Sequence, residues 1–84
     1  MSKQRTSEGG KNLISERLRA IREEKGISIR GMAKLLKEQG YEMDRNVVYR
    51  IEKNQRYVTD MEIKAFVEVL GVDYGYLIEG KKES

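Results

Sequence analysis

The sequence has 84 residues, no cysteine, no histidine and a formal net charge of +3. A chain of this length builds one small domain, and without thiol or imidazole groups it excludes disulfides, the usual zinc sites and most acid–base or nucleophilic catalysis. We therefore expect no enzyme, no metal and no other cofactor. Because no apolar run is long enough to cross a bilayer, we expect a cytoplasmic protein without a membrane partner.

Both ends of the sequence differ in composition from its middle. Residues 1–11 are polar and basic and lack periodic apolar positions, which predicts a flexible arm before a folded domain of residues 12–80. Lys3, Arg5 and Lys11 could add phosphate or minor-groove contacts, but an ordinary solvated tail also explains them, so no site is assigned there. Residues 81–84 are expected to form a C-terminal tail.

The folded part is predicted to be all-α, with five short helices, because apolar residues recur at helical and never at alternating spacing. The first helix is expected over residues 13–25, with Gly26 as its stop. The second begins after the N-cap Ser28 and ends at Gly40. Gly31 within it indicates close packing or simple tolerance, since glycine costs a helix about 1 kcal/mol.

Capping residues also mark the remaining helices. The third is predicted to begin after Asp44 as N-cap and to end at Asn54, a residue type that tolerates left-handed backbone. Thr59 and Glu62 have the spacing of a capping box, which starts the fourth helix. A short fifth helix is expected over residues 73–80.

The third predicted helix separates into two faces when its residues are placed about 100° apart. Its apolar face comprises Val47, Val48 and Ile51, and its polar face comprises Arg45, Asn46, Tyr49, Arg50 and Lys53. Any surface helix has a solvated polar face, usually with Glu–Lys pairs. Arginine and asparagine instead suit the edges of guanine and adenine. The pattern therefore favours a helix that reads bases in the DNA major groove.

Charge is unevenly distributed along the chain. Residues 45–56 contain four basic residues and one acidic residue, whereas residues 60–80 contain five acidic residues and one lysine. Such a molecule has one face suited to phosphates and another that avoids them. A solvated mixture of charges is the alternative explanation.

Three segments together resemble the lambda-repressor-like, Cro-type helix-turn-helix family across residues 14–80. They are ERLRAIREEKGIS at 16–28, VVYRIEKNQR at 47–56 and LGVDYGYLI at 70–78. The resemblance implies a helix-turn-helix formed by the second and third helices. It also implies a sequence-specific regulator of transcription that binds double-stranded DNA, most simply a repressor that occupies its operator.

The resemblance also implies roles at matching positions. Base contacts in the major groove are expected from Arg45, Asn46, Tyr49 and Arg50. Phosphate contacts are expected from the start of the second helix and the end of the third, at Ser28, Ile29, Arg30, Lys53, Asn54, Gln55 and Arg56. Arg22 and Glu52 are expected to form an ion pair that ties the first helix to the third.

Three features depart from the family pattern. Ile29 stands where a phosphate-binding glutamine is common, so its backbone amide would have to make that contact. The connection from Lys37 to Met43 is longer than the usual turn of about three or four residues, which would let the second helix run longer. Asp44 replaces a neutral serine or threonine, and its carboxylate would repel a phosphate unless cap hydrogen bonds hold it inward.

A single recognition helix gives limited specificity, so a homodimer is expected, with its contact near the fourth and fifth helices. Tyr74 is the candidate anchor, and Tyr57 and Val58 are further candidates. Leu77 and Ile78 are predicted to seal the core. The alternative is that Tyr74 simply lies on the surface.

A protein-interaction module on the same fold, such as an antitoxin or anti-repressor, is the alternative function. Its aromatic anchors for a protein partner would be Tyr41, Tyr57, Tyr74 and Tyr76, of which Tyr76 better suits the core. Salt distinguishes the two functions, because DNA binding weakens steeply with salt and an aromatic protein interface responds far less.

Overall fold

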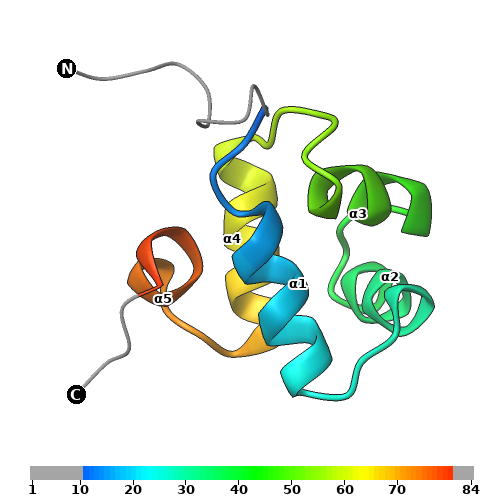
Figure 1. Ribbon diagram of the computed structural model, residues 1–84. Coiled ribbons are helices and arrows are strands. Elements are labelled where there is room, and N and C mark those ends of the chain that lie inside the picture. Colours follow the sequence, from blue (N-terminus) through cyan, green and yellow to red (C-terminus); the bar gives the residue numbers. More distant parts are fainter. Residues whose placement is uncertain (1–10, 81–84) are drawn as a thin grey trace, which may run out of the picture.

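The computed structural model describes residues 11–80, and in this range the chain forms five α-helices and no strand (Figure 1). They are α1 (Ser15–Glu24), α2 (Ile29–Glu38), α3 (Arg45–Glu52), α4 (Asp60–Leu70) and α5 (Tyr74–Glu79). The prediction of an all-α fold with five short helices is confirmed. The predicted C-terminal tail and all of the predicted arm except Lys11 lie outside the described residues.

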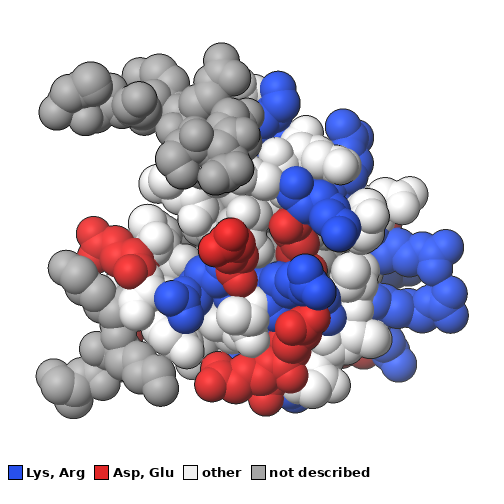
Figure 2. Space-filling model, in the orientation of Figure 1, with Lys and Arg blue, Asp and Glu red and all other residues white. Residues whose placement is uncertain are grey.

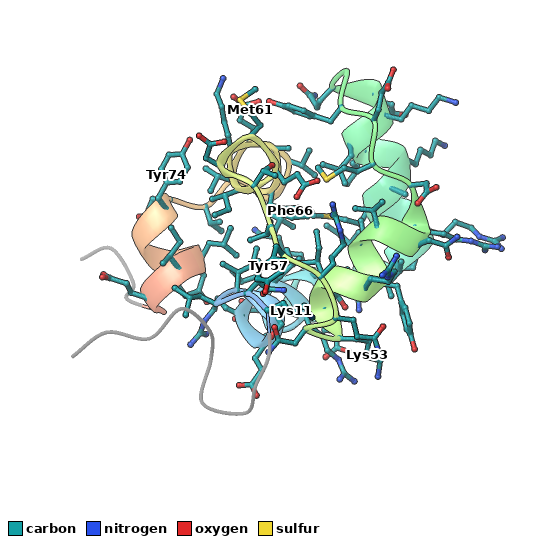
Figure 3. All side chains as sticks on the ribbon, turned by 90° about the horizontal axis from the view of Figure 1, so that it is seen from above. Lys11, Lys53, Tyr57, Met61, Phe66 and Tyr74 are labelled. Carbon is teal, nitrogen blue, oxygen red and sulfur yellow. The ribbon has the colours of Figure 1, made fainter. Side chains whose placement is uncertain are left out.

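The five helices surround one apolar core. α2 and α3 lie on one side of the molecule, α5 lies on the opposite side, and α1 and α4 run between them (Figure 1). Phe66 of α4 lies near the centre (Figure 3). Each helix contributes to the side chains that are fully or almost fully buried, which include Leu18, Ile21, Met32, Leu36, Val48, Ile51, Ala65, Phe66, Leu70 and Leu77.

Side chains cap four of the five helices. Ser28 and Asp44 each accept the backbone N–H of the third residue of the following helix, at 2.9 and 3.0 Å. Thr59 and Glu62 form the predicted reciprocal capping box at the start of α4, and Asp73 caps α5. Each cap stabilises its helix by about 1 kcal/mol. These local hydrogen bonds fix where the short helices begin.

Two details of the sequence prediction are wrong. α1 begins at Ser15, two residues later than predicted, and Asn12 and Leu13 precede the helix. Ile78, predicted to seal the core, is 36% exposed, whereas Leu77 is fully buried. Neighbouring residues on a helix point about 100° apart, so only one of them faces the core from a helix as short as α5.

Close packing explains Gly31. A Cβ at this position would lie 3.2 Å from the hydroxyl of Ser28 and 3.5 Å from a methyl group of Ile27. The first distance is shorter than ordinary van der Waals contact, so a larger residue would press on the cap of α2. Of the two explanations open from the sequence, the structure favours close packing.

The connection between α2 and α3 is long, and its side chains attach it to the rest of the fold. α2 ends at Glu38, and six residues then lead to α3. Tyr41 in this segment donates its hydroxyl to Glu68 of α4 at 2.5 Å, and Met43 is buried in the core. The extra residues therefore form an ordered connection and do not lengthen α2.

The hydrogen bond between Tyr41 and Glu68 predicts a loss of stability at alkaline pH. Glu68 accepts a hydrogen bond from the Tyr41 hydroxyl and thereby raises the pKa of Tyr41 above its usual value of 10.0. A group whose pKa is higher in the folded state stabilises the fold below its unfolded pKa, and this contribution is lost as the pH rises through the folded pKa. The contribution should therefore be complete below pH 10.0 and disappear above it.

Ultraviolet titration checks the raised pKa of Tyr41 on which this prediction rests. Tyr41→Phe should remove one tyrosine ionisation and thereby identify it, and Glu68→Gln should move that ionisation to lower pH. If Glu68→Gln left the titration unchanged, the hydrogen bond would not control the ionisation of Tyr41.

Candidate nucleic-acid interface

α3 presents one apolar and one polar face. Val48 and Ile51 are fully buried, and Val47 is partly buried against the core. The exposed side chains of the opposite face are Arg45, Asn46, Tyr49, Arg50 and, just after the helix, Lys53. Lys53 Nζ lies 5.6 Å from the centroid of the Tyr49 ring. The structure therefore brings together on one surface the residues expected to contact bases.

The N-terminus of α2 borders this polar face at two places. Arg30 and Arg45 line one groove of about 520 Å³, and Ile29, Tyr49 and Lys53 line a smaller cleft of about 150 Å³. The first amides of a helix have no partner within the helix, and the helix dipole makes this end positive. Anions therefore bind at such ends. The half-buried Ile29 can offer its backbone amide where the family commonly has a glutamine side chain.

Basic side chains gather at the edge of the molecule formed by α2 and α3 (Figure 2). Lys34 and Lys37 line the same groove as Arg30 and Arg45, although sequence analysis assigned no role to these lysines. The sequence does place Lys34 and Lys37 four and seven positions after Arg30, along one outer stripe of the helix, and this spacing is the signal that points to a shared surface. Glu42 and Asp44 also line the groove, and the Asp44 carboxylate accepts the cap hydrogen bond, so four basic residues face two acidic ones. The groove therefore carries an excess of positive charge.

The residues that follow α3 differ in their availability to phosphates. Lys53 and Gln55 are exposed. Asn54 adopts the predicted left-handed conformation, with φ of 62°, and its Oδ1 accepts two backbone N–H groups at 2.8 Å from the segment before α1. The Arg56 guanidinium donates to Glu62 of α4 at 3.2 Å. A phosphate contact by Arg56 would therefore compete with Glu62, whereas Asn54 is held through its acceptor oxygen.

Arg22 and Glu52 lie together and join α1 to α3. Arg22 Nε and Nη2 donate to the two carboxylate oxygens of Glu52 at 2.6 and 2.9 Å, and Nη1 donates to the carbonyl of Ile27 at 2.8 Å. The side chains are only 10% and 4% exposed. The hydrogen bonds that Arg22 donates to Glu52 raise the pKa of Arg22 above its usual value, so its guanidinium keeps its positive charge.

The candidate aromatic anchors fall into two groups. Tyr57 and Tyr74 are 62% and 47% exposed. Tyr41 and Tyr76 are half-buried and pack against the core. Val58, the third residue expected at the dimer contact, is also half-buried. Exposure therefore leaves Tyr57 and Tyr74 as the anchors available to a partner.

No helix within residues 11–80 combines the length and apolar character that a membrane span requires.

The geometry defines the class of this protein: α2 and α3, with the exposed basic face of α3, form a helix-turn-helix unit within a five-helix domain. A family model described as helix-turn-helix matches residues 18–77. The chain is also similar to the crystal structure of the DNA-binding domain of BldD, with 32% sequence identity and a TM-score of 0.70 over 87% of this chain and 97% of that chain. Among curated proteins, none matches the sequence significantly. The chain belongs to the lambda-repressor-like helix-turn-helix family.

Proposed function

We propose that this protein is a sequence-specific regulator of transcription that binds double-stranded DNA, a repressor of the Cro type that acts by occupying its operator. One observation carries the proposal: Arg45, Asn46 and Arg50 are exposed on α3, whose opposite face is sealed in the core. Arginine suits guanine and asparagine suits adenine in the major groove. The similarity to a DNA-binding domain at 32% identity supports the proposal.

The docking geometry follows from where the residues lie on α3. Arg45 and Asn46 occupy its first turn, and recognition helices contact base edges with their N-terminal residues. The start of α2 would meet a phosphate through its amides. Lys53 and Gln55, exposed at the other end of α3, would contact the neighbouring backbone. We expect no enzymatic activity and no cofactor.

Selection of binding sites from a random duplex library tests the function. The chain should enrich one motif, and its affinity for that motif should fall steeply as salt rises, because phosphate contacts release counterions. Failure to enrich any motif, together with DNA binding too weak to show a salt dependence, would overturn the proposal. The protein-interaction module, with Tyr57 and Tyr74 as its exposed anchors, would then be the better hypothesis.

We further propose that two copies bind one operator as a homodimer through the surface around α5 and the loop before α4. Tyr57 and Tyr74 support this surface, because exposed tyrosines supply apolar area with little loss of side-chain entropy. α5 lies on the side of the molecule opposite α3 (Figure 1), so a two-fold contact around it would leave the two copies of α3 on the outer flanks of the dimer. To read one operator they would have to lie about 34 Å apart, one turn of B-DNA.

Tyr74→Ala is expected to weaken cooperative binding to a two-fold symmetric site while leaving binding to a single half-site unchanged. The fold should persist, because the ring is largely outside the core. Sedimentation and footprinting measure the effect, with Ile78→Ala on the same helix as the matched control. A monomer that protects one non-palindromic half-site at saturation would contradict the dimer, and unchanged cooperativity in Tyr74→Ala would place the contact elsewhere.

A further inference from the structure

The segment before α1 is hydrogen-bonded to the C-terminal end of α3 and to the loop that follows it. Asn12 is only 6% exposed, and its Nδ2 donates to the carbonyls of Ile51 at 3.1 Å and Arg56 at 3.0 Å. In the other direction, Asn54 Oδ1 accepts the backbone N–H groups of Lys11 and Asn12, each at 2.8 Å. Asn12 and Asn54 thus form a two-way clasp across more than forty residues of sequence.

The clasp uses the chemistry of both asparagines. The Asn12 Nδ2 group donates both of its hydrogen bonds to carbonyls at the end of α3 and in the loop after it. Its Oδ1 accepts the N–H of Ile14 at 3.0 Å. Within residues 11–80, no buried side-chain nitrogen or oxygen lacks a hydrogen-bond partner. Asn54 combines the left-handed backbone, with φ of 62°, with an acceptor for two amides. Few residue types provide both at one position.

α3 is a short helix that packs against α2 and α1. It spans eight residues, about 12 Å at 1.5 Å per residue, and only Val48 and Ile51 are fully buried along it. The ion pair from Glu52 to Arg22 holds it against α1. The clasp holds the backbone itself at the same end, so a shift there would tilt the whole short helix and displace Arg45 and Asn46.

We propose that Asn12 and Asn54 are positioning residues that set the orientation of α3 and thereby its DNA sequence specificity, an inference that rests on the proposed function. Asn12 is too buried to touch DNA and acts through α3. Base contacts need donors placed within about 0.5 Å, whereas lysine contacts to phosphates adapt to small shifts. Loss of the clasp should therefore lower the preference for the selected operator over random DNA more than it lowers binding to random DNA.

Two variants and two controls test the clasp. Asn12→Ala removes both side-chain donors. Asn54→Gly keeps a residue suited to positive φ and removes the side chain that accepts the two amides, so it carries the test if Asn12→Ala does not fold. Asn54→Asp restores an acceptor and is the rescue variant. Val69→Ala, on a helix that packs chiefly against α2 and α5, controls for a general loss of stability.

The main measurement is the ratio of dissociation constants on random DNA and on the selected operator at one salt concentration. The clasp predicts that Asn12→Ala and Asn54→Gly lower this ratio by about 5- to 150-fold, as expected for losing one bidentate base contact. Asn54→Asp and Val69→Ala should keep it, because added charge or partial unfolding weakens both affinities alike. Ratios unchanged in Asn12→Ala and Asn54→Gly would overturn the inference.

Hydrogen exchange of the free protein separates this inference from the proposed function. Asn12→Ala and Asn54→Gly should speed amide exchange in α3 more than in α4, and Val69→Ala should not. If the wild-type chain preferred no DNA sequence, the proposed function would fail and specificity control by the clasp would fail with it. If the wild-type chain preferred an operator but exchange rose equally in α3 and α4, the clasp alone would be contradicted.

Discussion

Replacing Arg50 by alanine is expected to weaken binding to the selected operator by about 1 to 3 kcal/mol, or about 5- to 150-fold, without unfolding the domain. Arg50 lies on the exposed face of α3, opposite the buried Val48 and Ile51. A bidentate contact to a base would be lost, while the core is untouched. Asn46→Ala should have an effect in the same range. Binding assays at fixed salt and thermal unfolding measure the two consequences separately.

Lys53→Ala is the matched control for these substitutions. Lys53 is exposed at the end of the same helix, but a lysine contact to a phosphate carries no sequence information. Its loss should weaken binding to operator and random DNA alike and reduce the salt slope by about 1. Arg56→Ala should act in the same direction, with the loss of its ion pair to Glu62 added. Equal losses on both DNAs for all four variants would show that our base and phosphate assignments are wrong.

The features that the sequence predicted well depend on nearby residues. Ser28, Asp44 and Thr59 cap helices through amides three positions away, and the two faces of α3 follow from helical periodicity alone. Such patterns are visible without knowing how the chain folds back on itself. This is why the helix order, the caps and the exposed residues of α3 could be predicted.

The features that were missed depend on contacts between distant segments. Asn12 lies in a polar stretch with no periodicity, and its partners, in α3 and in the loop that follows it, are 39 and 44 positions away. Tyr41 bonds a carboxylate 27 positions away, so its role in ordering the long connection has no local signature. Arg56 was expected at a phosphate, but α4 brings Glu62 beside it. Arg22 and Glu52 were paired only through the family resemblance.

The largest expected effect on stability comes from Glu52→Ala. The substitution leaves the Arg22 guanidinium, whose side chain is only 10% exposed, with the carbonyl of Ile27 as its remaining partner in the site. Breaking a buried ion pair by removing one partner costs about 3 to 5 kcal/mol, because the other charge stays buried without compensation. We expect a loss toward the lower end of this range, since a partly exposed guanidinium regains some hydration. Urea unfolding monitored by circular dichroism gives the value.

A double-mutant cycle separates the ion pair from the two side chains that form it. Replacing both Arg22 and Glu52 by methionine should cost much less than Glu52→Ala, because apolar residues of similar volume often replace a buried pair with little loss. The coupling energy between the two positions should then be clearly favourable. A coupling energy near zero would mean that Arg22 stabilises the fold through the Ile27 carbonyl and its own packing. In that case the carboxylate of Glu52 would not hold α3 against α1, and the clasp from Asn12 would be the main hydrogen-bonded attachment of the recognition helix to the segment around α1.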